Sequence, residues 1–311
     1  MSSPKEDDGF TFVTHKKQQA SRPGRNRKGK NRFRERTLDE KLQAREAELR
    51  RSGYLEQCRK MLRDALSPAS ASETADTVQE PYPPPTCVVC LGLGSVSDST
   101  KAQDQYVMLK ELLFELQEEL DPGIKAAFYD PVFSPEDVTF LEEQGHVVRP
   151  ANHPLRLDQP TLLYIPHGPR TLFEAILAAN WDSPEQLSRV ILFGNRLDLY
   201  DDPTYSGSLR DRRKDVDGTG DELGESAELI AQAAKLFRIL PLPSTKEHLE
   251  AFNDLALQHV TPRKSAEKPA TFWRRAPPDI DEPCNSATSP SSSQVEVVEA
   301  ATDAIEKLSL Q

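Results

Sequence analysis

Residues 86–98 read Thr86-Cys87-Val88-Val89-Cys90-Leu91-Gly92-Leu93-Gly94-Ser95-Val96-Ser97-Asp98. The run begins with small and β-branched apolar residues without alternating polar positions. This pattern predicts a strand that is covered on both faces, as in parallel sheets. The two glycines lack a Cβ and so allow a tight turn and a close approach to a ligand. A helix that follows would point its free N–H groups and positive dipole end into that turn.

The residues beyond this turn alternate between strand and helix patterns. Further strands are predicted at 124–129, 146–148, 161–165, 190–193 and 236–240, and helices at 99–120, 134–145, 169–179 and 245–257. Such alternation implies a parallel sheet with right-handed crossovers. The expected fold class is therefore α/β, a Rossmann-like three-layer domain with a mainly parallel sheet, preceded by a helical segment and flanked by disordered tails.

Composition divides the rest of the chain. We expect a disordered basic arm (1–36), a helical segment (37–66), a linker (67–85), the α/β domain (86–258, with a mobile insertion at 196–225) and a disordered tail (259–311). Thr37 and Glu40 form the sequence pattern of a capping box, which predicts that the helical segment begins there. Gly53 is expected to interrupt it.

The totals favour a soluble nuclear or cytoplasmic protein. Only 37% of the 311 residues are hydrophobic and 25 are proline, so a sizeable part is not expected to pack into a core. No apolar stretch approaches the length of a membrane span, and the polar N-terminal residues do not resemble a secretory signal. The four cysteines are too scattered for a disulfide framework, which fits a reducing compartment.

Charge is distributed unevenly along the chain. Residues 1–36 hold eleven Lys and Arg against four Asp and Glu, a net charge of +7, so the remainder carries −18 of the total of −11. An acidic body repels nucleic acid, so any phosphate contact should come from the arm. The arm could also serve nuclear import or merely solubilise the chain. Its candidate contact residues are Arg22, Arg25, Arg27, Lys28, Lys30, Arg32 and Arg34.

Polar residues follow several of the predicted strands. Because the carboxyl ends of parallel strands meet at one edge of a sheet, these residues are candidates for a ligand crevice. The candidate ligand-binding residues are Gly92, Gly94, Ser95, Asp98, Asp130, His167 and Asn195.

Each candidate also has a structural interpretation. The glycine pair lacks the third glycine of a dinucleotide fingerprint, because Ser97 occupies that position. Asp130 precedes a proline and could simply stabilise a turn. His167 lies on a proline-flanked loop and could act as a general acid or base, or could anchor that loop by a hydrogen bond. Cys87 and Cys90 are expected to point to opposite faces of a strand and to pack in the interior. No spacing indicates a preformed metal site.

The ordered set of motifs resembles the SRR-like domain, the family named for sensitivity to red light reduced. The motifs are Cys90-Leu91-Gly92-Leu93-Gly94-Ser95, Tyr129-Asp130-Pro131-Val132-Phe133, Tyr164-Ile165-Pro166-His167-Gly168, Asn180-Trp181 and Phe193-Gly194-Asn195. The N-terminal Phe10-Thr11-Phe12-Val13 is similar to a Trp-Thr-Val-Val motif of the family. The resemblance implies a Rossmann-like domain in a eukaryotic regulatory family, linked to circadian and light signalling in plants and to haem-associated regulation in animals. Many members have cysteine where this chain has Gly168.

Three functions are compatible with these patterns. The first is a noncatalytic regulatory protein whose domain binds a small molecule or a protein partner, of unknown identity. The second is a methyltransferase-like enzyme with a nucleoside cofactor, in which Asp130 would hold the ribose and His167 would act as general acid or base. The third is nucleic-acid binding through the basic arm.

Overall fold

The computed structural model describes residues 36–67, 82–150, 154–200, 202 and 227–273. The chain divides into two units, residues 1–36 and 37–311, and only Arg36 of the first unit is described. The architecture below is therefore that of the second unit. The seven candidate contact residues of the basic arm lie outside the described residues, as do most of the predicted linker and insertion and the end of the tail.

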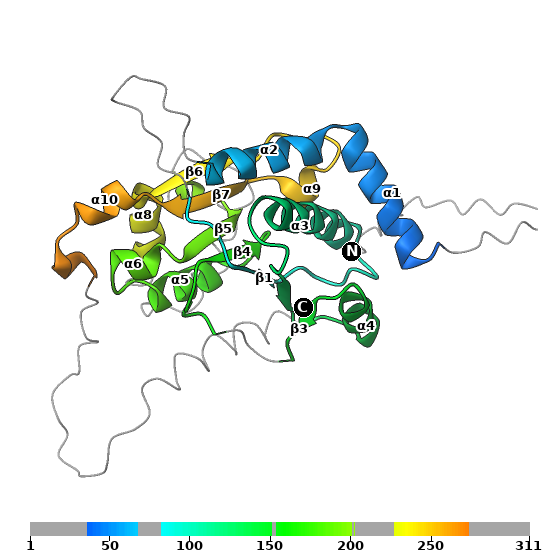
Figure 1. Ribbon diagram of the computed structural model, residues 1–311, viewed down its shortest axis with the longest axis horizontal. Coiled ribbons are helices and arrows are strands. Elements are labelled where there is room, and N and C mark those ends of the chain that lie inside the picture. Colours follow the sequence, from blue (N-terminus) through cyan, green and yellow to red (C-terminus); the bar gives the residue numbers. More distant parts are fainter. Residues whose placement is uncertain (1–35, 68–81, 151–153, 201, 203–226, 274–311) are drawn as a thin grey trace, which may run out of the picture. The chain divides into compact units, whose positions relative to one another are not determined.

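A sheet of seven strands forms the centre of this unit (Figure 1). The strands are β1 (Cys87–Leu91), β2 (Ala126–Tyr129), β3 (Val147–Val148), β4 (Thr161–Ile165), β5 (Val190–Asn195), β6 (Phe237–Pro241) and β7 (Leu255–Val260). Their order is β3-β2-β1-β4-β5-β7-β6. The first five pair in parallel, whereas β7 runs antiparallel to both β5 and β6. The predicted α/β class with a mainly parallel sheet is confirmed.

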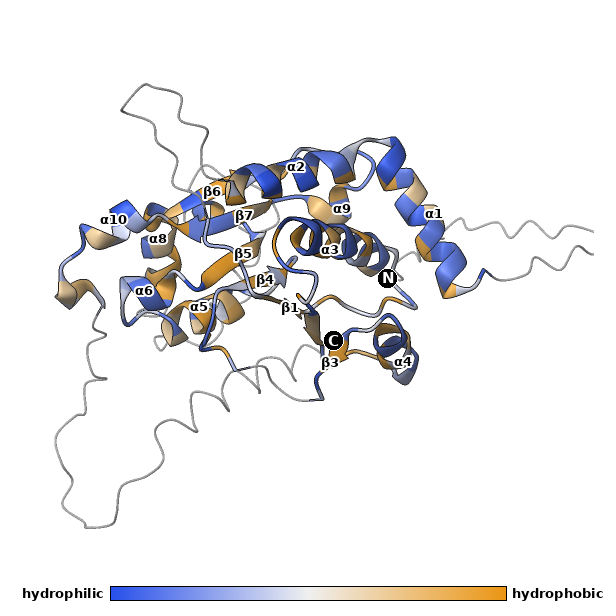
Figure 2. Ribbon diagram, viewed as in Figure 1, coloured by the Kyte–Doolittle hydropathy of each residue, from blue (hydrophilic) through white to orange (hydrophobic). Residues whose placement is uncertain are grey.

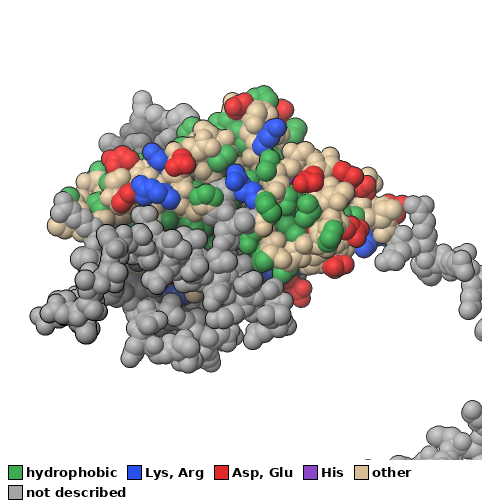
Figure 3. All heavy atoms as spheres, turned by 90° about the horizontal axis from the view of Figure 1, so that it is seen from below, with side chains coloured by type: hydrophobic (Ala, Val, Ile, Leu, Met, Phe, Trp, Pro, Cys, Tyr) green, Lys and Arg blue, Asp and Glu red, His purple; other side chains and the backbone are tan. Residues whose placement is uncertain are grey.

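Helices cover both faces of the sheet (Figure 1). One face carries α1 (Leu38–Arg51), α2 (Tyr54–Leu66), α3 (Thr100–Glu119), α4 (Pro135–Glu143) and α9 (Leu249–Phe252). The other carries α5 (Arg170–Ala179), α6 (Pro184–Leu187), η1 (Leu197–Leu199), α8 (Ala227–Leu236) and η2 (Ala270–Trp273), with α10 (Pro262–Ala266) beside α6. In Figure 2 the central strand β5 is apolar, while much of α1 and α2 is polar. Figure 3 shows one face of the molecule, on which hydrophobic, basic and acidic side chains are interspersed.

The sequence of β1 explains why both faces need covering. Val88 and Cys90 belong to the core under α3, and Val89 and Leu91 belong to the core on the opposite face. Successive side chains of a strand point to opposite faces, so a strand without polar positions is stable only between two layers of helices. The interior packing predicted for the two cysteines is confirmed for Cys90, which is buried. Cys87, at the start of the strand, is only partly buried, and its thiol lies 3.2 Å from the Thr161 hydroxyl.

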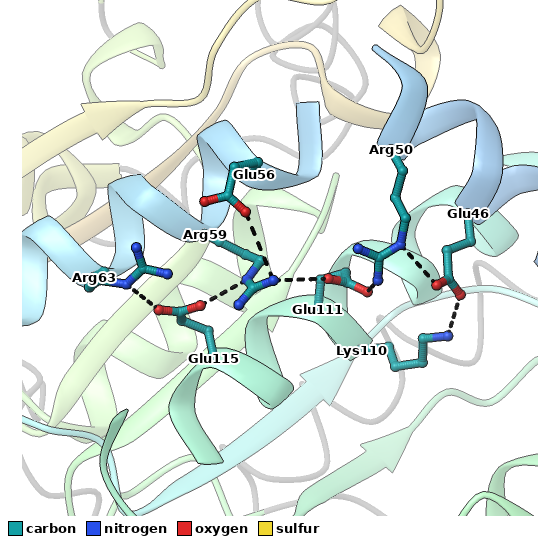
Figure 4. Close-up of polar contacts among 8 residues, drawn as sticks. All are labelled: Glu46, Arg50, Glu56, Arg59, Arg63, Lys110, Glu111 and Glu115. Carbon is teal, nitrogen blue, oxygen red and sulfur yellow. Dashed lines mark hydrogen bonds and ion pairs between the residues drawn. The ribbon is translucent and has the colours of Figure 1, made fainter. Parts of the chain in front are cut away.

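The helices α1 and α2 are attached to α3 by ion pairs (Figure 4). The predicted capping box of Thr37 and Glu40 is present, and Gly53 adopts a φ of 71° between the two helices. On α3, the buried carboxylate of Glu115 accepts hydrogen bonds from Arg59 (2.8 Å) and Arg63 (2.6 Å). The buried Glu111 pairs with Arg50 and lies 3.8 Å from Arg59. The helical segment is thus part of the folded unit.

The helix predicted over 245–257 is wrong for most of its length. Only Leu249–Phe252 is helical, and the chain then continues as β7. All residues of β7 are buried, because it lies between β5 and β6 and under helices on both faces. The strand shows no polar alternation, because three apolar residues are followed by Gln258 and His259 in succession. Periodicity cannot distinguish a short buried segment of this kind from a buried helix.

The folded unit also exceeds the predicted domain. The predicted end at 258 falls within β7, and Trp273 is buried beyond it, so residues 259–273 are not a tail. Likewise, Leu197 and Tyr200 pack in the core although they were assigned to the insertion. Tyr82, assigned to the linker, is buried, and its hydroxyl donates to the carbonyl of Arg238 at 2.8 Å.

Candidate functional site

The register of the sheet brings the ends of four neighbouring strands into one row. Leu91 pairs with Tyr129, Cys90 with Tyr164, and Ile165 with Gly194. Leu91 therefore also lies beside Ile165, and one residue beyond Tyr129, Leu91, Ile165 and Gly194 the row consists of Asp130, Gly92, Pro166 and Asn195. With neighbouring strands about 4.8 Å apart, the row spans about 14 Å. The sequence prediction that these strand ends share one edge of the sheet is consistent with this register.

The glycine turn is held by the carboxylate of Asp130. Gly92 and Gly94 adopt φ values of 70° and 81°, which favour glycine. The N–H of Gly94 donates to Asp130 Oδ2 at 2.7 Å, and the N–H of Val132 donates to Oδ1 at 2.9 Å. Asp130 thus stabilises its own turn, as the structural interpretation predicted, and also the turn after β1. A carboxylate has about four lone-pair positions, so further donors can still bind.

Burial raises the pKa of Asp130, and the negative charge of Asp137 raises it further, while the two N–H donors oppose both effects. Asp137 is fully buried at the start of α4. Its Oδ1 accepts the N–H of Ser97 at 2.8 Å, and its Oδ2 accepts both the N–H and the hydroxyl of Ser134. Burial alone would raise the pKa of Asp137, but these hydrogen bonds outweigh it and the pKa is lowered.

The other candidates of the β1–α3 loop surround the glycine turn. The Ser95 hydroxyl lies 3.0 Å from that of Ser97 and accepts the N–H of Asp98 at 3.3 Å. The side chain of Asp98 is exposed. Ser99 caps α3 by accepting the N–H of Ala102. The loop therefore places small hydroxyls and one exposed carboxylate beside the row of strand ends.

His167 lies one residue beyond the row, after β4. It has a φ of 60°, unusual for a residue other than glycine, and its Nε2 lies 3.1 Å from the carbonyl oxygen of Ala251 in α9. This contact is the loop anchor that the structural interpretation predicted. A Cβ on the following Gly168 would lie 2.6 Å from Ile165 Cγ2, so a larger residue at this position would require Ile165 to move.

Asn195 is brought to the edge, but its side chain is fully buried. Its Nδ2 donates to the carbonyl of Gly168 at 2.9 Å and to the hydroxyl of Tyr200 at 2.8 Å. Its Oδ1 is buried without a hydrogen-bond partner among the described residues. Asn195 therefore supports the turn that carries His167, and its Oδ1 is enclosed by the protein.

Sequence reasoning missed two groups near this edge. Asp137 connects α4 to the loop after β1 through its hydrogen bond with Ser97. In the sequence, Ser134 and Asp137 indicated only the start of a helix. His248, just before α9, is buried, and its Nδ1 lies 2.9 Å from Asp104 Oδ2. The same carboxylate accepts two hydrogen bonds from Arg45 of α1. No local pattern links these three residues, because they are far apart in the chain.

The described residues contain no group of three or more His, Cys, Asp or Glu side chains that could hold a metal ion. Within the same residues, none of the helices is both long and apolar enough to cross a membrane.

Comparison with known proteins identifies relatives of this chain. The family model described as the SRR1 domain matches residues 58–259. A mouse SRR1-like protein is 36% identical over 110 residues, 34% of this chain and 43% of the relative. The Arabidopsis thaliana protein SENSITIVITY TO RED LIGHT REDUCED 1 is 30% identical over 119 residues, 37% and 41% of the two chains. A Drosophila melanogaster SRR1-like protein is 29% identical over 196 residues, 61% of each chain.

The matches thus span between 41% and 61% of the length of these curated relatives. No solved structure matches this chain.

Proposed function

The chain belongs to the SRR1 domain family, and we propose that it is a noncatalytic regulatory protein whose α/β domain binds a small molecule at the carboxyl edge of its sheet. The observation that carries the proposal is the row of Asp130, Gly92, Pro166 and Asn195, because open α/β sheets bind ligands beyond the carboxyl ends of their strands. A protein partner on the same edge is the alternative occupant.

The regulatory part of the proposal draws on the relatives. The name of the Arabidopsis protein refers to sensitivity to red light, which describes a response rather than a reaction. A role in light or circadian signalling, or in haem-associated regulation, follows for this chain only by analogy. Action in the cytoplasm and nucleus belongs to the same proposal.

Isothermal titration of the full chain with a panel of nucleosides and nucleotides tests the small-molecule site. We expect Asp130→Asn to weaken binding by about tenfold, because a carboxylate accepts stronger hydrogen bonds than an amide. Asp121→Asn is the matched control: Asp121 also accepts a turn N–H, that of Gly123 at 2.8 Å, but it lies before β2, at the opposite edge. If both substitutions weaken ligand binding equally, or if neither weakens it, the ligand does not bind at this edge.

A methyltransferase-like enzyme is the second candidate, and the strand order favours it. The usual dinucleotide-binding order is 3-2-1-4-5-6. Here a reversed β7 is inserted between β5 and β6, an order shared with Rossmann-like methyltransferases. The analogy is one of fold alone. His167 would have to use Nδ1 for acid–base chemistry, since Nε2 contacts Ala251. Titration without heat from S-adenosylmethionine would remove this candidate.

Nucleic-acid binding through the basic arm remains a separate prediction from the sequence. If the arm binds RNA, deletion of residues 1–36 should weaken the affinity and flatten its salt dependence, because fewer phosphates would be neutralised. If the chain without residues 1–36 binds RNA with the same affinity and salt dependence as the full chain, this function is excluded.

A further inference from the structure

We propose that His248, the buried histidine before α9, is a positioning residue for His167 and acts on it through the short helix α9. The inference concerns how the loop after β4 is held. It goes beyond the proposed function, because it involves no ligand and can fail while that function stands. Its basis is a continuous series of hydrogen bonds that leads from α1 and α3 through α9 to the His167 ring.

Arg45 of α1 and Asp104 of α3 hold the His248 ring. Asp104 is buried, and its two carboxylate oxygens accept hydrogen bonds from Arg45 at 2.6 and 2.8 Å. Such a pair of bonds fixes the plane of the carboxylate. Asp104 Oδ2 lies 2.9 Å from His248 Nδ1, and Arg45 Nη2 lies 3.1 Å from the same nitrogen. The ring is fully buried, and Nδ1 has a partner in either neutral tautomer.

The backbone of His248 begins α9. Its carbonyl accepts the N–H of Ala251 at 3.1 Å and the N–H of Phe252 at 3.2 Å. The helix has only four residues, Leu249–Phe252. A helix of one turn is not stable on its own, because nucleation costs more than the few bonds recover. The position of α9 therefore depends on what holds its start, and the His248 ring is the anchor there.

The other end of the series is the carbonyl of Ala251, which lies 3.1 Å from His167 Nε2. A carbonyl oxygen only accepts hydrogen bonds, so Nε2 carries the proton in this contact. Ala251 thus donates its N–H to His248 and accepts a bond from His167, and one residue joins the two histidines. His167 also has a φ of 60°, which a residue other than glycine keeps only where surrounding contacts enforce it.

A second contact from α3 reaches the same carbonyl. Gln105, the neighbour of Asp104, donates from Nε2 to the Ala251 carbonyl at 3.0 Å. Figure 1 shows α9 beside α3. The bond from Gln105 joins two neutral groups, whereas the contact of His248 with Asp104 involves a carboxylate and is the stronger kind. We therefore expect α9 to shift, held only by Gln105, when the anchor at His248 is lost.

Nuclear magnetic resonance of the full chain with His248→Phe tests the inference. Phenylalanine keeps an aromatic ring beside Phe252 but cannot bind Asp104, which retains Arg45 as its partner. We expect the Nε2 proton of His167 to exchange with water about five- to tenfold faster in this variant, the effect of losing one hydrogen bond. The backbone signals that report the positive φ of His167 should shift as well.

His259→Phe is the matched control. His259 is also buried, and its Nε2 lies 2.9 Å from the carbonyl of Ser188, outside α9. This substitution removes a histidine contact of the same kind, so it should lower the stability and leave the His167 signals unchanged. The inference is overturned if His248→Phe leaves these signals as they are in the natural chain, or if His259→Phe alters them equally.

Gln105→Met provides a second test, which decides the matter even if His248→Phe fails to fold. It removes the other hydrogen bond to the Ala251 carbonyl and leaves the contact between Asp104 and His248 in place. Exchange of the His167 Nε2 proton should then rise by less than about threefold, because the start of α9 stays anchored. A larger rise would show that Gln105, and not His248, positions this carbonyl.

Discussion

Gly92 and Gly145 form a natural pair for testing backbone strain at single residues. Both have a positive φ, 70° and 82°, and a Cβ added to either would meet no atom within 4 Å. Alanine at these positions should therefore cost only the strain of a left-handed conformation, about 1–2 kcal/mol. We expect Gly92→Ala and Gly145→Ala to lower the free energy of unfolding by similar amounts in urea titrations.

The two variants should differ in ligand binding, because only Gly92 lies in the row of strand ends. Calorimetric titration should show weakened binding for Gly92→Ala and unchanged binding for Gly145→Ala. If either variant loses far more than about 2 kcal/mol of stability, side-chain contacts and not the positive φ require glycine at that position.

For single residues, the sequence predicted some of the neighbours at the carboxyl edge of the sheet and missed others. Gly92 and Asp130 could be predicted to lie together because each directly follows a strand. The register of β1 and β2 places them side by side. The roles of Asp137 and Asn195 could not be predicted in the same way. Their hydrogen bonds reach Ser97 and Gly168, residues distant in the sequence, and no periodicity encodes such contacts.

Among the elements, α3 provides a test of how α1 and α2 are attached. Burial raises the pKa of Glu115, but the hydrogen bonds that it accepts from Arg59 and Arg63 outweigh this effect and lower the pKa. Glu115→Gln should destabilise the protein by about 1–3 kcal/mol, because paired charges would lose their buried partner. Glu119 lies one turn further along the helix, 3.5 Å from the same Arg63, and is half exposed.

Glu119→Gln is therefore the matched control, and we expect it to change the stability by less than about 0.5 kcal/mol. Both free energies of unfolding can be measured in urea at neutral pH. If the two substitutions lower the free energy of unfolding equally, the burial of the ion pairs of Glu115 does not contribute to stability.

The strand β7 makes a prediction about pH. Burial lowers the pKa of His259 from 6.5 to about 4, against the opposing hydrogen bond to the carbonyl of Ser188. The unfolded chain therefore takes up a proton before the folded one as the pH falls from 6.5 towards 4. His259 thus contributes stability above pH 6.5 that is lost across this window, about 2–3 kcal/mol by pH 4.5.

His259→Gln keeps a donor for Ser188 but cannot titrate. Between pH 7 and pH 4.5, the free energy of unfolding should fall by about 2–3 kcal/mol less in this variant than in the natural chain. Parallel pH profiles of the two proteins would contradict the assignment to His259.

The same strand shows where element prediction fails. The parallel strands β1, β4 and β5 could be predicted because each is a short apolar run with a glycine or proline at its end. Gly92 follows β1, Pro166 follows β4, and Gly194 is the second-last residue of β5. Before β7, Asp254 has a φ of 56°, and this sharp turn has no glycine to mark it. A helical pattern could therefore be extended through residues that in fact complete the sheet.

For the whole molecule, the sequence predicted the layers but not their limits. Alternating elements were sufficient for a parallel sheet between helices. The boundaries at 86 and 258 followed composition, and composition does not register that polar helices such as α1 and α2 can be held by buried ion pairs. Nor does it register that Trp273, in a segment rich in proline and charge, packs against Trp181 with ring centroids 5.7 Å apart.

The extent of the folded unit can be tested by truncation. A chain of residues 37–273 retains α1, α2, all of β7 and the Trp273 contact, and we expect it to unfold cooperatively at nearly the same urea concentration as the full chain. A chain of residues 86–258 lacks the partners of Glu111 and Glu115 and exposes the apolar core beneath α2. A large exposed apolar surface is strongly destabilising, so this chain should aggregate or lose its cooperative transition. Circular dichroism and size-exclusion chromatography distinguish the two outcomes, and a stable monomer of residues 86–258 would mean that α1 and α2 are accessories rather than a layer of the domain.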